Sequence, residues 1–188
     1  MLKFIRFNSL IGEIGVVWDE KSKLLKQVIL PERSTNRQNP SLIAFHGVIE
    51  ETSPNKEIFR VMSDIKDVIL GKEVTFDINR LDFSDMTEFQ RKVLTKQSEI
   101  PYGKVITYKK LAQMIDKPKS ARPVANVLSN NLFPLVVPCH RTVRSDWTVG
   151  GYAGSNDGYY KRFILEHEGI KIVDDVISKE YRYLEDDD

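Results

Sequence analysis

The sequence of 188 residues contains one cysteine, Cys139. A single thiol excludes an intrachain disulfide framework and any zinc site built from several cysteines. We therefore expect a reducing, intracellular setting, which is the cytoplasm, or the nucleus if the source is eukaryotic. We also expect no bound metal and no cofactor.

Long apolar segments are equally absent. No apolar run approaches the roughly 20 residues that a membrane-spanning helix needs, and charged residues interrupt the first six positions, where a signal peptide would be apolar. The sequence thus predicts a protein that is neither inserted in a membrane nor exported. With 41% apolar and 29% charged residues, the composition is that of an ordinary globular protein.

The formal net charge is only +1, but the charges are unevenly distributed. Residues 87–170 carry 13 basic and 7 acidic side chains, whereas residues 171–188 carry 3 basic and 7 acidic ones. A basic block attracts polyanions at long range, although such an asymmetry is equally typical of an ordinary solvated surface. The sequence therefore indicates a basic segment followed by an acidic C-terminal tail at 171–188.

The first 82 residues predict an N-terminal α+β domain. Three runs rich in branched and aromatic residues are separated by turn residues, which favours an antiparallel meander. These runs are 2–7, 14–18 and 24–30. Apolar spacing predicts a helix over 55–70 ending at Gly71, and 75–78 favours one more strand. The domain contains no defensible set of catalytic residues, and His46 reads as a packed or surface histidine.

A second domain, 83–170, is predicted to be mainly helical. Thr87 with Gln90 forms a capping-box pattern for a helix over 88–97. Thr107 and Ser120 are expected to cap two further short helices, over 108–115 and 121–129. These two helices, joined by a tight polar turn and surrounded by basic residues, form a helix-turn-helix candidate, although ordinary globular proteins also contain such pairs.

The only thiol follows an apolar run, 132–137, and stands in the sequence Pro138-Cys139-His140-Arg141. One interpretation is a small buried hydrophobic residue, as most unpaired cysteines are. The other is a nucleophile, because a nearby imidazole and guanidiniums would lower the thiol pKa and increase the thiolate fraction. Successive side chains of an extended segment point to opposite sides, so His140 need not contact Cys139 directly. A proton relay through water fits the sequence as well as direct contact does.

These residues resemble the O6-alkylguanine-DNA alkyltransferases. The hallmark of that family is Pro-Cys-His-Arg after an apolar strand, and further motifs flank it in the family's order and spacing over about 85 residues, 87–170. The matching segments are 100–105, 107–112, 121–124, Asn131, 137–141, 150–154 and 165–169. Residues 1–80 match the family's variable N-terminal domain only in size and strand content.

The resemblance implies a role for each matching residue. Cys139 would take the alkyl group from guanine O6 by in-line displacement and become a thioether, which water cannot displace, so that the protein is consumed. His140 would act as a base through water, with Glu168 stabilising the imidazolium. Asn131 would hold the turn that presents the cysteine, and Tyr108 would donate a proton or hydrogen bond to the leaving guanine. Activity on O4-alkylthymine stays open.

Double-stranded DNA is the implied partner, bound through the minor groove by a monomer. The damaged base must be flipped out of the duplex, and Arg122 would fill its place in the stack. The family's fold implies a ribonuclease-H-like N-terminal domain and a winged-helix-like C-terminal domain. The expected DNA contacts are Tyr108, Lys119, Ala121, Arg122 and Asn126, and the expected pocket residues are Pro134, Val149, Tyr152 and Ala153.

Some positions depart from the family pattern. Pro123, Ala125 and Asn126 make the second helix stiffer and bulkier than usual, and Thr142 replaces a valine. Three functions are alternatives to alkyl transfer. A damage-flagging alkyltransferase-like protein would lack the reactive cysteine, and a helix-turn-helix regulator would present large polar side chains to the major groove. A thiol hydrolase would turn over repeatedly.

Overall fold

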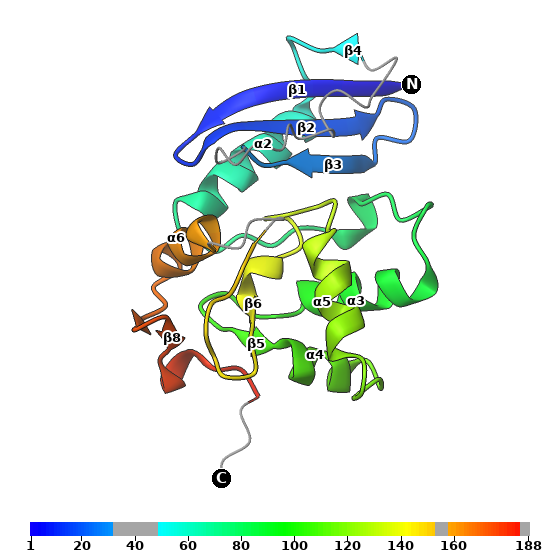
Figure 1. Ribbon diagram of the computed structural model, residues 1–188. Coiled ribbons are helices and arrows are strands. Elements are labelled where there is room, and N and C mark those ends of the chain that lie inside the picture. The colour runs from blue at the N-terminus through cyan, green and yellow to red at the C-terminus, as the bar shows by residue number, and fades with distance from the viewer. Residues whose placement is uncertain (32–48, 153–157, 185–188) are drawn as a thin grey trace, which may run out of the picture.

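The computed structural model describes residues 1–31, 49–152 and 158–184 (Figure 1). A four-stranded sheet in the order β3-β2-β1-β4 lies above a mainly helical part, and helix α2 runs along the sheet. The architecture is thus a mixed helix-and-sheet fold with small sheets. Within the described residues, no helix is long and apolar enough to cross a membrane.

The N-terminal sheet confirms the predicted meander. Strands β1 (Leu2–Ser9), β2 (Gly12–Asp19) and β3 (Leu25–Ile29) are antiparallel neighbours. The short β4 (Ile49–Glu50) pairs in parallel with β1. The central strand β2 is buried from residue 14 to residue 18, so it forms the middle of the N-terminal core.

Helix α2 (Lys56–Ile69) is also confirmed. The Asn55 side chain accepts hydrogen bonds from the first-turn amides and so caps its start. The predicted strand at 75–78 was wrong, because that segment is irregular and leads into the short 3-10 helix η1 (Ile78–Arg80). The Asp77 side chain accepts the Asn79 amide hydrogen, which starts this turn in place of a strand.

Four α-helices lie in the described residues of the C-terminal part. They are α3 (Glu88–Ser98), α4 (Tyr108–Met114), α5 (Ala121–Ser129) and α6 (Tyr159–His167). The capping box of Thr87 and Gln90 and the Thr107 cap are confirmed. The predicted Ser120 cap was wrong. Its backbone, at φ −102° and ψ 25°, is not extended as a capping serine requires, and its side chain makes no capping hydrogen bond.

The acidic C-terminal tail, 171–188, is folded up to residue 184. It forms β7 (Ile172–Val173), β8 (Val176–Ile177) and the 3-10 helix η3 (Lys179–Tyr181). The Val105 amide donates to the Tyr181 carbonyl, and the Val105 carbonyl accepts the Tyr183 amide. Ile177 is fully buried in a small apolar cluster with Val105 and Val149, and burial of such side chains stabilises the segment.

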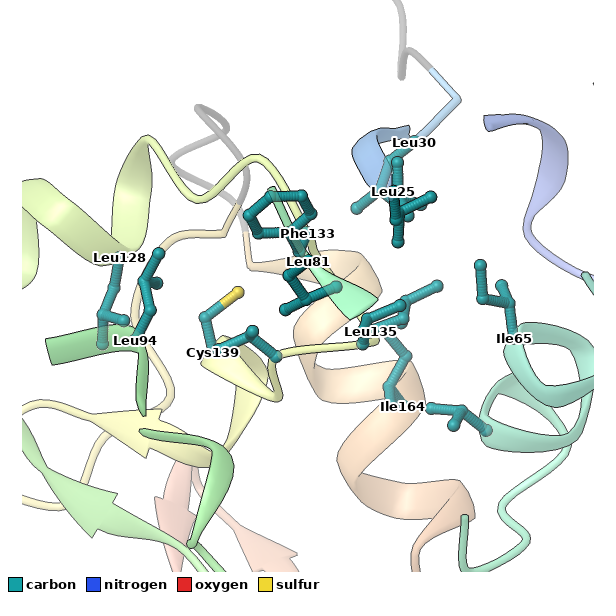
Figure 2. Close-up of a cluster of buried hydrophobic side chains, with 14 of the residues drawn as sticks. Leu25, Leu30, Ile65, Leu81, Leu94, Leu128, Phe133, Leu135, Cys139 and Ile164 are labelled. Atoms are coloured by element: carbon teal, nitrogen blue, oxygen red, sulfur yellow. The ribbon is translucent and has the colours of Figure 1, made fainter. Parts of the chain in front are cut away.

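One large apolar cluster joins the sheet to the helical part (Figure 2). Its labelled members in Figure 2 come from both halves of the chain, among them Leu25, Ile65, Leu81, Phe133, Cys139 and Ile164. Two backbone hydrogen bonds hold β3: the Asp82 amide donates to the Leu25 carbonyl within the N-terminal part, and the Val28 amide donates to the Leu132 carbonyl of the C-terminal part. The segment that leads to the cysteine is therefore anchored on strand β3.

Candidate active site

Cys139 lies at the start of η2 (Cys139–Arg141), a 3-10 turn that continues into the short strand β6 (Thr142–Val143). β6 pairs in parallel with β5 (Ile106–Thr107). The apolar run before the turn is buried from residue 133 to residue 137. It includes a tight reversal in which buried Leu135 has φ 73°, a conformation that costs a non-glycine residue energy and persists where packing enforces it.

Asn131 contacts the thiol directly. Its side-chain amide donates to Cys139 Sγ at 3.2 Å and to the Val137 carbonyl at 3.2 Å. Its side-chain oxygen accepts the Phe133 amide hydrogen at 2.9 Å. Asn131 thus connects both ends of the apolar segment and also contacts the sulfur at its end.

The Cys139 thiol is only 6% exposed. Burial raises its pKa, and the hydrogen bond from Asn131 acts in the opposite direction without cancelling the effect. The sequence suggested instead that neighbouring cations would lower the thiol pKa. That expectation was wrong because burial dominates, while the Arg141 guanidinium faces a carboxylate and not the sulfur. A base must therefore take the thiol proton when the site reacts.

His140 and Arg141 both contact Glu168, the residue that ends α6. His140 Nε2 lies 2.8 Å from Glu168 Oε1. Arg141 donates from Nε and from one terminal nitrogen to the same carboxylate, at 2.9–3.1 Å, and from the other to the Ile100 carbonyl. Arg141 therefore pairs with a carboxylate of the same C-terminal part. The Glu168 side chain is 1% exposed.

The protonation of this triad follows from its burial and charges. Burial would raise the pKa of Glu168, but the charges and hydrogen bonds of His140 and Arg141 outweigh it and lower the pKa to about 2. Burial lowers the pKa of His140, although Glu168 acts in the opposite direction. An ionised carboxylate accepts, so a neutral His140 carries its hydrogen on Nε2.

This tautomer leaves the lone pair of His140 on Nδ1. Nδ1 is buried and makes no hydrogen bond to any of the residues that the structure describes. An unpaired imidazole nitrogen next in sequence to the thiol is the acceptor that a general base requires. Glu168, which Arg141 holds in place, keeps the imidazole hydrogen on Nε2. Nδ1 on the opposite side of the ring therefore stays unprotonated and basic.

Two tyrosines and a lysine complete the surroundings of the sulfur. The ring of Tyr152 meets that of His140 edge to face, with centroids 6.4 Å apart. Burial, then the charge of a Cys139 thiolate, raises the pKa of Tyr152 well above its usual value and that of Tyr108 to about 12. Both phenols are therefore neutral and able to donate.

Lys161 is a buried residue that the sequence reading missed. Its side chain is 1% exposed, donates to the Thr142 carbonyl at 2.6 Å and lies 5.8 Å from the centre of the Tyr108 ring. Burial lowers its pKa to about 8. One signal in the sequence could have found it, because Lys161 shares the buried face of α6 with Ile164 and Leu165.

The expected pocket residues divide into three groups. Pro134 and Tyr152 are buried, and Tyr152 meets the His140 ring, whereas Ala153 lies outside the described residues. Val149 packs in the second apolar cluster, and its amide donates to the Asp175 carbonyl at 3.1 Å. The Val149 amide is thus occupied by the C-terminal hairpin.

Helix α5 presents a polar face beside this site. Its apolar side, with Val124 and Leu128, is buried, while Arg122 and Asn126 are exposed one turn apart. Lys119 is exposed in the turn between α4 and α5, and Ala121 is partly exposed. The face thus presents basic and polar side chains, of the kinds that contact phosphates in protein–DNA complexes. No cluster of potential metal ligands occurs within the described residues.

The comparison of the sequence with known families and the comparison of the fold with known structures agree with each other. Residues 88–170 match the family model described as 6-O-methylguanine DNA methyltransferase, DNA binding domain. The crystal structure of the O6-methylguanine-DNA methyltransferase from Pyrococcus kodakaraensis superposes with a TM-score of 0.65 at 28% identity, covering 90% of this chain and 100% of that one. Fold and site thus define a cysteine-dependent DNA alkyltransferase class.

Two relatives extend the match into the N-terminal half. The methylated-DNA–protein-cysteine methyltransferase of Methanothermobacter thermautotrophicus is 38% identical over 160 residues, which are 85% of this chain and 81% of that protein. The one from Methanosarcina acetivorans is 35% identical over 164 residues, 87% and 96% of the two chains. The chain belongs to the methylated-DNA–protein-cysteine methyltransferase family.

Proposed function

We propose that this protein repairs DNA directly, by moving the alkyl group of O6-alkylguanine onto Cys139 in a single turnover. The observation that carries this proposal is the buried Cys139-His140-Glu168 arrangement, in which the only thiol is next in sequence to an imidazole whose Nδ1 has no partner among the described residues. O4-alkylthymine presents an equivalent alkyl–oxygen bond and is a second candidate substrate.

In the proposed reaction the Cys139 thiol gives its proton through a water to His140 Nδ1. The thiolate then attacks the alkyl carbon, the S–C bond forms and the C–O6 bond breaks. The electron pair of that bond goes to the guanine, and the neutral Tyr108 hydroxyl stabilises it by donating. The Glu168 carboxylate balances the imidazolium charge. The product thioether is stable to water, so each molecule reacts once.

Access to a base inside a duplex determines the proposed binding mode. Unstacking and unpairing the base costs a few kcal/mol, which an inserted side chain offsets. We assign this role to Arg122 on α5, with Lys119, Ala121 and Asn126 along the minor groove. In this proposal the N-terminal part, 1–82, is ribonuclease-H-like and supports the site, and the C-terminal part, 83–170, is winged-helix-like, binds DNA as a monomer and performs the chemistry.

The experiment that tests the function measures the intact mass after incubation with a duplex oligonucleotide carrying O6-methylguanine. We expect the protein to gain one methyl group, in proportion to the protein and not catalytically, and we expect Cys139→Ala to gain none. Tight lesion binding without a mass change would indicate a damage-flagging protein. Repeated turnover would indicate a hydrolase, and neither binding nor transfer would indicate a regulator.

Arg122→Ala is expected to separate base flipping from chemistry. Loss of the inserted side chain should slow transfer from the duplex by about tenfold or more, since each 1.4 kcal/mol of lost stabilisation is tenfold in rate. Transfer from a short single-stranded oligonucleotide with the same lesion should change much less, because no duplex has to open. Lys119→Ala is the control for loss of one positive charge. Equal slowing on both substrates would contradict the role of Arg122.

A further inference from the structure

Gln97 is a buried polar side chain that the proposed reaction does not use. It lies on α3 with no exposed surface. Its side-chain amide nitrogen donates to the Pro138 carbonyl at 2.8 Å, and its oxygen accepts the hydroxyl hydrogen of Thr142. A buried amide is costly unless both of its ends are paired. Here both ends are paired, and both partners lie in the cysteine turn.

The two partners of Gln97 flank the reactive residues. Pro138 immediately precedes Cys139, and Thr142 immediately follows Arg141. The turn between them has a single internal backbone bond at each end, from the Arg141 amide to the Pro138 carbonyl and from the Thr142 amide to the Cys139 carbonyl. A rigid amide on a neighbouring helix that bonds both ends fixes the turn against α3.

We propose that Gln97 is a positioning residue for alkyl transfer, which holds the sulfur of Cys139 and the Nδ1 of His140 in their reactive relation through this bridge from Pro138 to Thr142. The inference rests on the proposed function of Cys139. Gln97 itself touches neither substrate nor sulfur. Its effect is geometric, and a displacement of about 1 Å in a reacting group costs about 100-fold in rate.

The bridge is specific to polar side chains at both positions. Thr142 stands where the resembled family pattern has valine, which has no hydroxyl to donate. The carbonyl of Thr142 accepts from Lys161 at 2.6 Å, so the residue is held from two sides, by α3 and by α6. Replacing Gln97 therefore loosens one side of the turn while α6 still retains the other, and we expect the chain to fold.

The first test compares Gln97→Leu with wild type, using single-turnover transfer from the methylated duplex well below the unfolding midpoint. Transfer is expected to be slower by about 10- to 100-fold. Thr142→Val removes one of the two bonds and should slow transfer by about two- to tenfold, as expected for one neutral hydrogen bond. The matched control is Gln113→Leu, because Gln113 is an exposed glutamine on the neighbouring helix α4.

Gln97→Glu gives a readout that a purely structural role would not change. A protonated carboxyl donates to the Pro138 carbonyl as the amide does, whereas a carboxylate cannot. Burial raises the pKa of such a carboxyl. The transfer rate of Gln97→Glu divided by that of wild type should therefore rise as the pH falls from about 8 to about 5. Gln113→Glu should give a constant ratio over the same range.

A second arm does not depend on DNA repair. Cys139 is the only thiol, so labelling by iodoacetamide reports on this residue alone. A loosened turn exposes the sulfur more often, so Gln97→Leu should label severalfold faster while it transfers the methyl group more slowly. If wild type labels but never takes a methyl group, the proposed function fails, and this arm still tests the bridge.

Three outcomes would overturn the proposal. One is a transfer rate of Gln97→Leu within twofold of wild type. Another is a rate ratio of Gln97→Glu that does not change with pH. The third is full recovery of the rate in Gln97→Leu/Thr142→Val, because that apolar pair restores packing but leaves the Pro138 carbonyl without its side-chain donor. Recovery of stability alone in the double variant, with slow transfer, supports the proposal.

Discussion

Replacing Glu168 with glutamine is expected to slow alkyl transfer by about 10²- to 10⁴-fold, the range that a positioned base contributes. An amide at this position carries no negative charge, so it no longer stabilises the imidazolium that forms when His140 accepts the thiol proton. The same change leaves the buried Arg141 guanidinium without its counter-charge, because its other partners among the described residues, the Ile100 carbonyl and the Tyr102 ring, are neutral.

The stability of the same variant should decrease by about 3–5 kcal/mol, the cost of removing one partner of a buried ion pair. Single-turnover transfer and urea unfolding measure the two effects. The control is Glu166→Gln, which removes a carboxylate two residues away that is half exposed and 3.5 Å from Arg162. Such a surface pair contributes little. A Glu168→Gln variant with normal transfer would remove Glu168 from the mechanism.

The stability loss should depend on pH in one direction. Glu168 has a folded-state pKa of about 2 against an ordinary value of 4.5. Its contribution of about 3 kcal/mol is fully present above pH 4.5 and is lost as the pH falls towards 2, since the unfolded chain then binds the proton first. The difference between wild type and Glu168→Gln should therefore be constant near neutrality and shrink below pH 4.5. A constant difference down to pH 2 would contradict this assignment.

Methylation of Cys139 is expected to destabilise the folded protein. The sulfur lies in the large apolar cluster, flanked in Figure 2 by Leu94 and Leu128 on one side and Leu81 and Leu135 on the other. An extra methyl group in a packed core costs about 1–3 kcal/mol, which for a chain of this length lowers the melting temperature by roughly 2–12 °C. A thioether also cannot ionise to the thiolate that the Asn131 amide would stabilise.

Thermal unfolding of protein whose methylation is verified by mass measures this effect. Cys139→Ala incubated with the same methylated duplex is the control, because it binds but cannot be modified, and its melting temperature after removal of the DNA should be unchanged. A larger alkyl group should cause a larger decrease. Equal melting temperatures before and after transfer would show that the site has room for the product.

The features that the sequence predicted correctly are local. The strands of the meander, helix α2, the capping box at Thr87 and the Thr107 cap depend on residues within three or four positions of one another, so the signal lies in a short window. The incorrect expectations at 75–78 and at Ser120 are also local. At 75–78 the Asp77 side chain starts a turn where the pattern favoured a strand. At Ser120 the backbone angles differ from those of the cap that the pattern favoured.

The candidate site was recognisable from motif spacing, because Cys139, His140 and Glu168 stand in a pattern that few other proteins share. The electrostatics of the site were not recognisable. The sequence suggested that a nearby imidazole and guanidiniums would lower the pKa of the thiol. The raised thiol pKa, the pairing of Arg141 with Glu168 and the bond of Val149 to Asp175 are all set by burial and by contacts that the turn itself does not contain.

The sequence by itself therefore determined the local elements, the single nucleophile candidate and the resemblance to a family. Only the tertiary structure decided which charges are buried together, that Lys161 and Gln97 support the cysteine turn from α6 and α3, and that the acidic segment up to residue 184 folds against Val105. The physical reason is that burial and ion pairing depend on residues distant in the chain, which periodicity and capping patterns do not encode.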